Sequence, residues 1–114
     1  MTAERDMYDF EKDWLTKYPY RLSRKFEEKL PRFSSHEEAK NYFEEQFGDD
    51  FIPESVDIID GEKIFFYYLV VHRENFDKFI KELKEKGFSA DAEEGALSYH
   101  KVEIWENGNV HIVY

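Results

Sequence analysis

The sequence predicts a single α+β domain with a mainly antiparallel sheet of about five strands and helices packed on it, in the element order ααα-ββ-α-βββ. Apolar residues recur at helical spacing up to Gly48, and two-residue alternation with hairpin turns replaces that spacing afterwards. The length of 114 residues fits one domain and is too short for two ordinary ones. We therefore expect a helical part over residues 1–48 and a sheet-forming part over residues 54–114.

The first two predicted helices are amphipathic segments that end at prolines. Apolar residues at positions i, i+3 and i+7 predict a helix from about Ala3 to Lys17. Pro19 ends it, because the residue before a proline disfavours the helical conformation. A second, shorter helix covers about Tyr20 to Lys29, and Pro31 stops it.

The third predicted helix has the clearest boundaries. Ser34 with Glu37, and Ser35 with Glu38, form two overlapping capping boxes of the kind that satisfies backbone N–H groups at a helix start. An aromatic stripe follows, and Gly48 is suited to end the helix in a left-handed conformation.

The dipeptide Asp60-Gly61 predicts a β-hairpin between two strand-like segments. A two-residue type I′ loop would pair Asp57 with Ile64, whereas a three-residue loop with a glycine bulge would pair Val56 with Ile64. We predict the bulged loop, because it places two apolar residues opposite each other.

The remaining elements follow from apolar patterning and turn residues. Ile64–Val71 is apolar on both faces and should be an internal strand that is covered on both sides. Helical spacing predicts a helix over Arg73–Lys86, closed by Gly87. The five predicted strands cover about Val56–Ile59, Glu62–His72, Phe88–Ala92, Leu97–Trp105 and Val110–Tyr114.

The clearest turn of the chain is Glu106-Asn107-Gly108. A three-residue loop here pairs Trp105 with Asn109 and gathers apolar residues on one face, whereas a two-residue loop would scatter them over both faces. Burial sets the register of a strand pair, so we predict the three-residue loop. The opposite face then carries Lys101, Glu103, Trp105, Asn109 and His111.

The composition restricts the classes of partner. The net charge of −10 repels nucleic acid and attracts basic protein surfaces. The chain has no cysteine, no signal-peptide pattern and no apolar run near the ~20 residues that span a bilayer. We expect a cytoplasmic bacterial protein without a membrane partner, and the charge argues against nucleic acid as a ligand.

The outer face of the last hairpin is the first candidate site. Trp105 would be an interface anchor there, with Lys101 beside it. Glu103 opposite His111 could orient an imidazole as a general base, or could be an ordinary cross-strand pair under covering helices. We favour a protein-binding surface over catalysis at this face.

Carboxylates on the third predicted helix are the second candidate site. These residues are Glu37, Glu38, Glu44 and Glu45. They could bind a basic partner, or they could be only a solvated helix face. The one cationic stretch, residues 17–32, is expected to pair with acidic helices of the same molecule or of a second copy.

Motifs for chemistry are missing from the sequence. The histidines lack metal-ligand spacing, the serines lie in no nucleophile elbow, and the glycines are too dispersed for nucleotide binding. We therefore predict no catalytic residue, no metal and no cofactor. The leading interpretation is a small acidic non-enzymatic protein-binding domain, such as a regulator, inhibitor or immunity-type protein that acts on a basic partner. The alternatives are a structural homo-oligomer, such as a homodimer, and a small-ligand binder or enzyme that uses Glu103 and His111.

Overall fold

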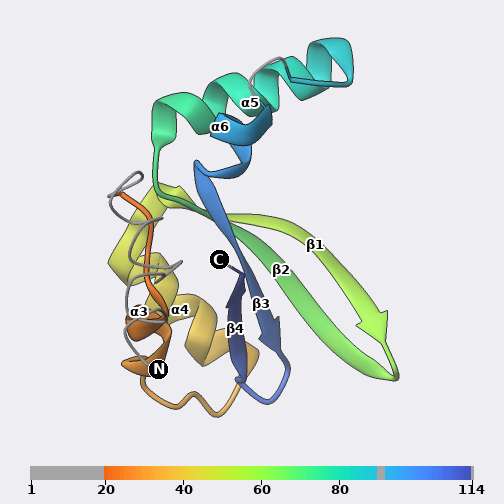
Figure 1. Cartoon of the computed structure of the whole chain (residues 1–114). Coiled ribbons are helices and arrows are strands. Elements are labelled where there is room, and N and C mark those ends of the chain that lie inside the picture. Colours follow the sequence, from red (N-terminus) through yellow and green to blue (C-terminus); the bar gives the residue numbers. More distant parts are fainter. Residues whose placement is uncertain (1–19, 90–91, 114) are drawn as a thin grey trace, which may run out of the picture.

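The computed structural model of the chain describes residues 20–89 and 92–113, and Figure 1 shows their arrangement. The helices are α3 (Arg24–Glu28), α4 (His36–Phe47), α5 (Arg73–Lys86) and α6 (Ala92–Ala96), with a 3-10 turn, η1 (Gly48–Asp50), after α4. The strands are β1 (Phe51–Ile59), β2 (Glu62–Val70), β3 (Tyr99–Trp105) and β4 (Val110–Val113). They form one antiparallel sheet in the order β1-β2-β3-β4, so the predicted α+β class and antiparallel sheet are confirmed.

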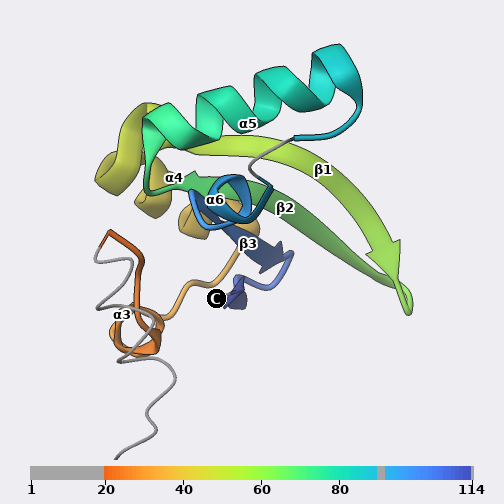
Figure 2. The same ribbon diagram turned by 45° about the horizontal axis from the view of Figure 1, so that its top comes forward.

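Helices pack on both faces of this sheet (Figures 1 and 2). On the first face, which we call the α4 face, Phe43 of α4 stacks on Phe51 with ring centroids 5.0 Å apart. On the opposite face, the α5 face, Phe76 of α5 meets Tyr68 and Tyr99 edge-on. The buried core cluster on the α4 face consists of Ala39, Phe43, Phe51, Tyr67, Leu69, Val102, Ile104 and Ile112. Strand β2 is internal, as predicted, and has buried residues on both faces.

Helix α4 begins where the capping boxes predicted. The Ser35 hydroxyl accepts the backbone N–H of Glu38 at 3.1 Å, and the Glu38 carboxylate accepts the Ser34 hydroxyl at 3.0 Å. Gly48 follows the helix with a φ of +56°, a conformation that a residue with a Cβ rarely adopts. The second predicted helix is shorter than expected, since α3 covers only Arg24–Glu28. The helix predicted over Ala3–Lys17 lies outside the described residues.

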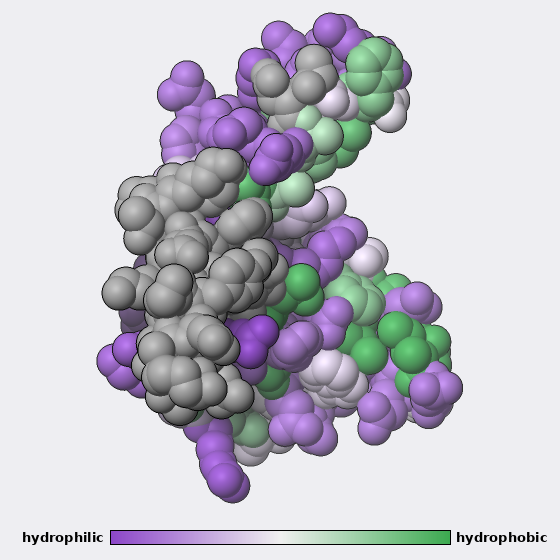
Figure 3. All heavy atoms as spheres, viewed as in Figure 1, coloured by the Kyte–Doolittle hydropathy of each residue, from purple (hydrophilic) through white to green (hydrophobic). Residues whose placement is uncertain are grey.

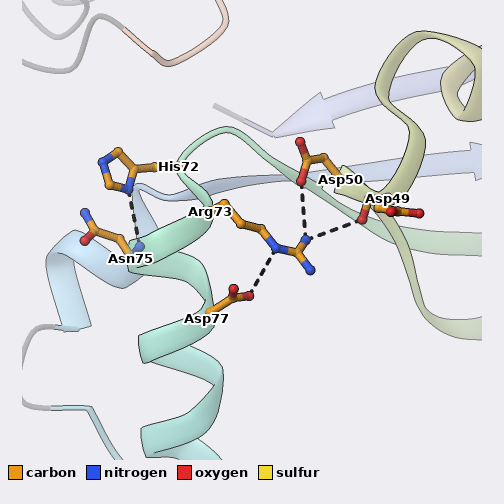
Figure 4. Close-up of polar contacts among 6 residues, drawn as sticks. All are labelled: Asp49, Asp50, His72, Arg73, Asn75 and Asp77. Carbon is orange, nitrogen blue, oxygen red and sulfur yellow. Dashed lines mark hydrogen bonds and ion pairs between the residues drawn. The ribbon is translucent and has the colours of Figure 1, made fainter.

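Helix α5 is held at its start by polar contacts (Figure 4). The ring of His72 accepts the backbone N–H of Asn75 at 3.3 Å. Arg73 forms ion pairs of 3.3 Å with Asp50 at the end of η1 and with Asp77 one turn along the helix. The helix covers Arg73–Lys86 and is closed by Gly87 in the left-handed conformation, as predicted.

The predicted register of the first hairpin is wrong. Asp57 lies opposite Ile64, and Ile59 opposite Glu62, so the loop has two residues. Asp60 and Gly61 have φ values of +54° and +80°, which is the type I′ geometry. This turn matches the twist of the flanking strands, and the hairpin end is too exposed for burial to impose the bulged register. Strand β1 also starts earlier than predicted, at residue 51.

The register of the last hairpin is confirmed. Ile104 lies opposite Val110 and Val102 opposite Ile112, and the N–H of Trp105 bonds the carbonyl of Asn109 at 2.9 Å. Val102, Ile104 and Ile112 are all fully buried on the α4 face. Burial therefore decides this register, as the apolar pattern indicated.

The fifth predicted strand, over residues 88–92, is not formed by the described residues. Phe88 and Ser89 follow α5 without strand pairing, and Ala92 begins α6. Gly95 lies inside α6 and is buried. A Cβ at this position would collide with the ring of Phe79, so the glycine allows α6 to pack closely against α5.

Candidate interaction surface

The two edges of the sheet are protected differently. At the β4 edge, Glu27 of α3 accepts the backbone N–H of Ile112 at 2.8 Å. At the β1 edge, no strand among residues 20–89 and 92–113 pairs with the outer side of β1. Unpaired strand edges are sites where another chain can add, so among the described residues the β1 edge is the one left open.

The end of the β1–β2 hairpin extends beyond the helices (Figure 1). Strand β2 pairs with β3 only from Ile64 onward, so the residues nearer the turn have β1 as their neighbour. Three aliphatic side chains are exposed there: Val56 at 52%, Ile58 at 68% and Ile59 at 45%. Figure 3 shows hydrophobic residues at the surface over this hairpin, with hydrophilic residues around them. Val56 and Ile58 point to the α4 face of the hairpin and Ile59 to the opposite face. We call these three side chains the hairpin patch.

The hairpin patch is continuous with the start of α4. Val56 lies opposite Phe65, and the ring of His36 stacks on Phe65 with centroids 3.5 Å apart. The Nε2 atom of His36 is 2.6 Å from the hydroxyl oxygen of Tyr67, which fixes the imidazole over the sheet. Burial lowers the pKa of His36, so its ring is neutral at pH 7. Val56 therefore lies beside an aromatic surface over which Lys63 also extends, with its Nζ atom 5.2 Å from the centroid of the Phe65 ring.

Carboxylates surround this apolar area. Glu37 and Glu44 are exposed on α4, the helix that packs on the α4 face. Burial, followed by the charges of Glu44 and Glu37, raises the pKa of Tyr67 to about 12. Glu45 is exposed, and Glu38 is exposed but bonded to Ser34. The hairpin itself carries Glu54, Asp57, Asp60 and Glu62 against a single lysine, Lys63.

The predicted C-terminal hairpin face is partly occupied by internal contacts. Lys101 forms an ion pair of 2.6 Å with Glu54 and lies over the ring of Tyr68. Trp105 is half-buried, as is Glu103. His111 lies opposite Glu103 in the sheet, but its Nδ1 atom is 3.9 Å from a carboxylate oxygen of Glu27.

A shallow hollow of about 310 Å³ lies beside this face. Its lining is Arg21, Ala96, Tyr99, Lys101, Glu103 and Val113. Glu103 reaches the hollow, whereas His111 is not part of its lining. The two residues of the alternative catalytic interpretation therefore do not converge on this hollow.

Arg21 and His100 form a buried polar cluster behind the hollow. Arg21 donates to the carbonyls of Leu97 at 2.9 Å and Tyr99 at 2.8 Å. His100 accepts the backbone N–H of Leu22 at Nε2, so its Nδ1 carries the proton and donates to the carbonyl of Val113 at 3.0 Å. Arg21 was expected to pair with an acidic helix, but it bonds backbone carbonyls and joins the N-terminal segment to β3.

Burial, followed by the charge of Arg21, lowers the pKa of His100 to about 4. The ring is therefore neutral at pH 7, which suits a donor and acceptor inside a core and not a proton-transfer group at a surface. The cluster supports the fold, and its side chains are too buried to contact a macromolecular partner.

The sequence indicated the acidic residues of this surface but not the hairpin patch. The feature of the sequence that could have predicted the patch is the run of apolar residues directly before Asp60-Gly61. No helix can cover such residues if the hairpin extends beyond the rest of the sheet. The bulged register concealed it, because that register placed Val56 opposite Ile64, a buried residue.

The described part of the chain brings together no group of three His, Asp or Glu side chains that could hold a metal ion. Within the same residues, no helix combines the length and the apolar character that a membrane span requires. Comparison with protein-family models, with curated proteins and with solved structures finds no match to this chain.

Proposed function

We propose that this domain is a small acidic non-enzymatic binding protein, a regulator, inhibitor or immunity-type protein that docks on a basic partner through the hairpin patch and its acidic surroundings. The observation that carries the proposal is the exposure of Val56, Ile58 and Ile59 together at the end of one hairpin. Val56 and Ile58 share the α4 face and Ile59 lies on the α5 face, and exposed apolar side chains with a polar rim are typical of protein interfaces.

The energetics favour a protein partner for this patch. Full burial of one aliphatic side chain contributes about 1.5–3 kcal/mol, so three provide a useful apolar centre. Most other aliphatic residues of the sheet are buried or half-buried, with Val113 of β4 exposed at 43%, whereas these three are exposed together at the end of one strand pair. An anchor on a strand also loses little entropy on binding.

The charge supports a basic partner. The protein has a net charge of −10, and Glu37 and Glu44 lie on the same side of the sheet as Val56. A field of this sign steers a basic surface toward the patch and accelerates association at low ionic strength. It also selects against nucleic acid and against other acidic proteins.

The test is affinity capture from native lysate with the wild-type domain and two variants. In the hairpin variant, Val56, Ile58 and Ile59 are changed to Ser, which removes the patch without touching the core. The matched control changes Leu83 and Phe88 to Ser, since these apolar residues are also exposed but lie at the far end of α5.

We expect the wild type and the control to retain the same protein, and the hairpin variant to lose it. Raising the salt concentration should weaken capture by the wild type and the control alike, because screening removes the steering field. Retention of the partner by the hairpin variant would contradict the proposal, and so would capture that does not change with salt concentration.

A structural homo-oligomer is the second candidate, and the open β1 edge favours it over association through Trp105, which is half-buried. Two copies would bring together two chains of charge −10, which opposes association at low salt. Light scattering over a range of protein and salt concentrations separates this candidate from the first.

A further inference from the structure

We infer that the outer edge of β1, from Ser55 to Ile59, takes up an extended segment of the partner as an added strand, with a Lys or Arg facing Asp57 between two apolar residues. This inference rests on the proposed function and names its binding mode. Strand addition combines backbone hydrogen bonds, which give affinity, with alternate side chains, which give specificity.

The type I′ turn determines which backbone groups face the open edge. In a two-residue hairpin the flanking residues, here Ile59 and Glu62, exchange both backbone hydrogen bonds. The alternation of an antiparallel pair then directs Asp57 toward β2, and Ile58 and Val56 away from it. The N–H and C=O groups of these two residues therefore point to the outer edge.

A side-chain contact supports this assignment independently. The Oδ1 atom of Asp57 accepts the backbone N–H of the next residue, Ile58, at 2.8 Å. That N–H can reach the carboxylate only because it is not bonded to β2. Asp57 thus occupies the position where the carbonyl of an added strand would bind, and it would be released when the strand arrives.

The available edge is short. Pro53 has no N–H, and the pairing of β1 with β2 shifts between Pro53 and Ser55, which bends the strand. Beyond Ile59 the chain turns at Asp60. The edge therefore offers about five residues with two outward-facing backbone positions, which suits a segment of a partner and not a whole sheet.

The side chains along this edge define the partner segment. Val56 and Ile58 lie on the α4 face, opposite Phe65 and Lys63, and would contact apolar residues at alternate positions of the added strand. Asp57 lies on the α5 face, in the position where side chains of neighbouring strands approach most closely. The residue opposite Asp57 should be a cation, which agrees with the basic partner inferred from the net charge.

A second copy of this chain is a poorer occupant of the same edge. The antiparallel pairing that matches Val56 with Ile58 also places the Asp57 side chains of the two copies opposite each other. Like charges at that position destabilise a strand pair. The partner segment is therefore expected to come from a different, basic protein.

The test uses Ile58→Pro, with Ile58→Ala as the matched control. Proline removes the outward N–H and is tolerated on an edge strand whose N–H faces solvent, whereas alanine removes the side chain and keeps the N–H. The ligand is a synthetic peptide with a Val-Lys-Val core flanked by threonines, and a Val-Glu-Val peptide is its control. Binding is followed by the NMR shifts and hydrogen exchange of the backbone amides.

We expect the Val-Lys-Val peptide to slow exchange at Val56 and Ile58, and the Val-Glu-Val peptide to bind about 10-fold more weakly. Ile58→Pro should abolish this binding, whereas Ile58→Ala should only weaken it. Asp57→Lys should reverse the preference between the peptides. If the proline variant does not fold, a peptide N-methylated at both valines replaces it and should not bind.

Equal binding of the peptide to Ile58→Pro, or no difference between the two peptides, would overturn the inference. So would protection of the same amides at high protein concentration without peptide, since it would identify a second copy as the occupant. Capture of the native partner by Ile58→Pro, but not by the triple serine variant, would leave the proposed function standing and refute strand addition.

Discussion

Acidification should destabilise this domain through His100, the imidazole buried between Arg21 and β4. In the folded protein its pKa is about 4, because burial and then the Arg21 charge oppose protonation. In the unfolded chain the pKa returns to about 6.5. Above pH 6.5 the ring is neutral in both states, so His100 adds no pH dependence to the free energy of unfolding.

As the pH falls below 6.5, His100 is protonated in the unfolded chain but stays neutral in the folded protein. The folded state then loses about 1.4 kcal/mol per pH unit, until the folded pKa is reached near pH 4. Over that interval the loss amounts to about 3 kcal/mol. This is a large fraction of the 5–15 kcal/mol that typically stabilises a small domain.

The assay is urea unfolding of the wild type and of His100→Gln at several pH values between 7.5 and 4. The amide of glutamine cannot take up a proton, so the variant lacks this pH dependence. It is less stable at pH 7.5, because the amide replaces the imidazole in its buried hydrogen bonds. The other histidines and all carboxylates are common to both proteins, so they cancel in the difference between them. A difference that stays constant down to pH 4 would refute the reasoning.

Two further substitutions test the packing around the sheet. Gly108→Ala should destabilise the domain by about 2–4 kcal/mol in thermal or urea unfolding, because its φ is +93° and a Cβ would collide with the backbone of Phe33. Gly87→Ala is the control, since its φ is +77° but no atom lies near the added Cβ, and it should cost only about 1 kcal/mol. Equal losses would mean that the chain before α4 does not pack on the last turn. Arg21→Met should cost about 2–4 kcal/mol, since it leaves two carbonyls unbonded, and should raise the pKa of His100, as measured by NMR titration. An unchanged His100 titration would exclude the charge of Arg21 as a cause of its low pKa.

The two hairpins show when a register can be predicted from the sequence. In the last hairpin, a shift by one residue would move Val102 and Ile104 out of a core closed by α4, so the apolar pattern is decisive. In the first hairpin, Val56 and Ile58 are exposed in the observed register, so a shift changes little burial. The local conformations of Asp60 and Gly61 then decide the pairing.

Two other features depend on packing that a sequence pattern does not show. Gly95 resembles a turn residue, but it is required by the close approach of α6 to Phe79. Arg21 belongs to a cationic stretch that suggested a surface, yet its guanidinium is buried and bonded to carbonyls that become adjacent only when β3 forms. In both cases the deciding neighbour is far away along the chain.

The unequal protection of the sheet edges is the strongest structural argument for a partner. Proteins usually block both edges of a sheet, because an open edge invites aggregation. Here Glu27 of α3 blocks β4, and Pro53 with the adjacent bulge interrupts β1 near its start. Between Ser55 and Ile59, the Asp57 carboxylate is the only group of the described residues that protects the edge. It would repel another acidic chain and would form an ion pair with a basic one. An edge that disfavours its own copies and accepts a cationic strand is what the proposed binding to a basic partner would need from a protein of charge −10.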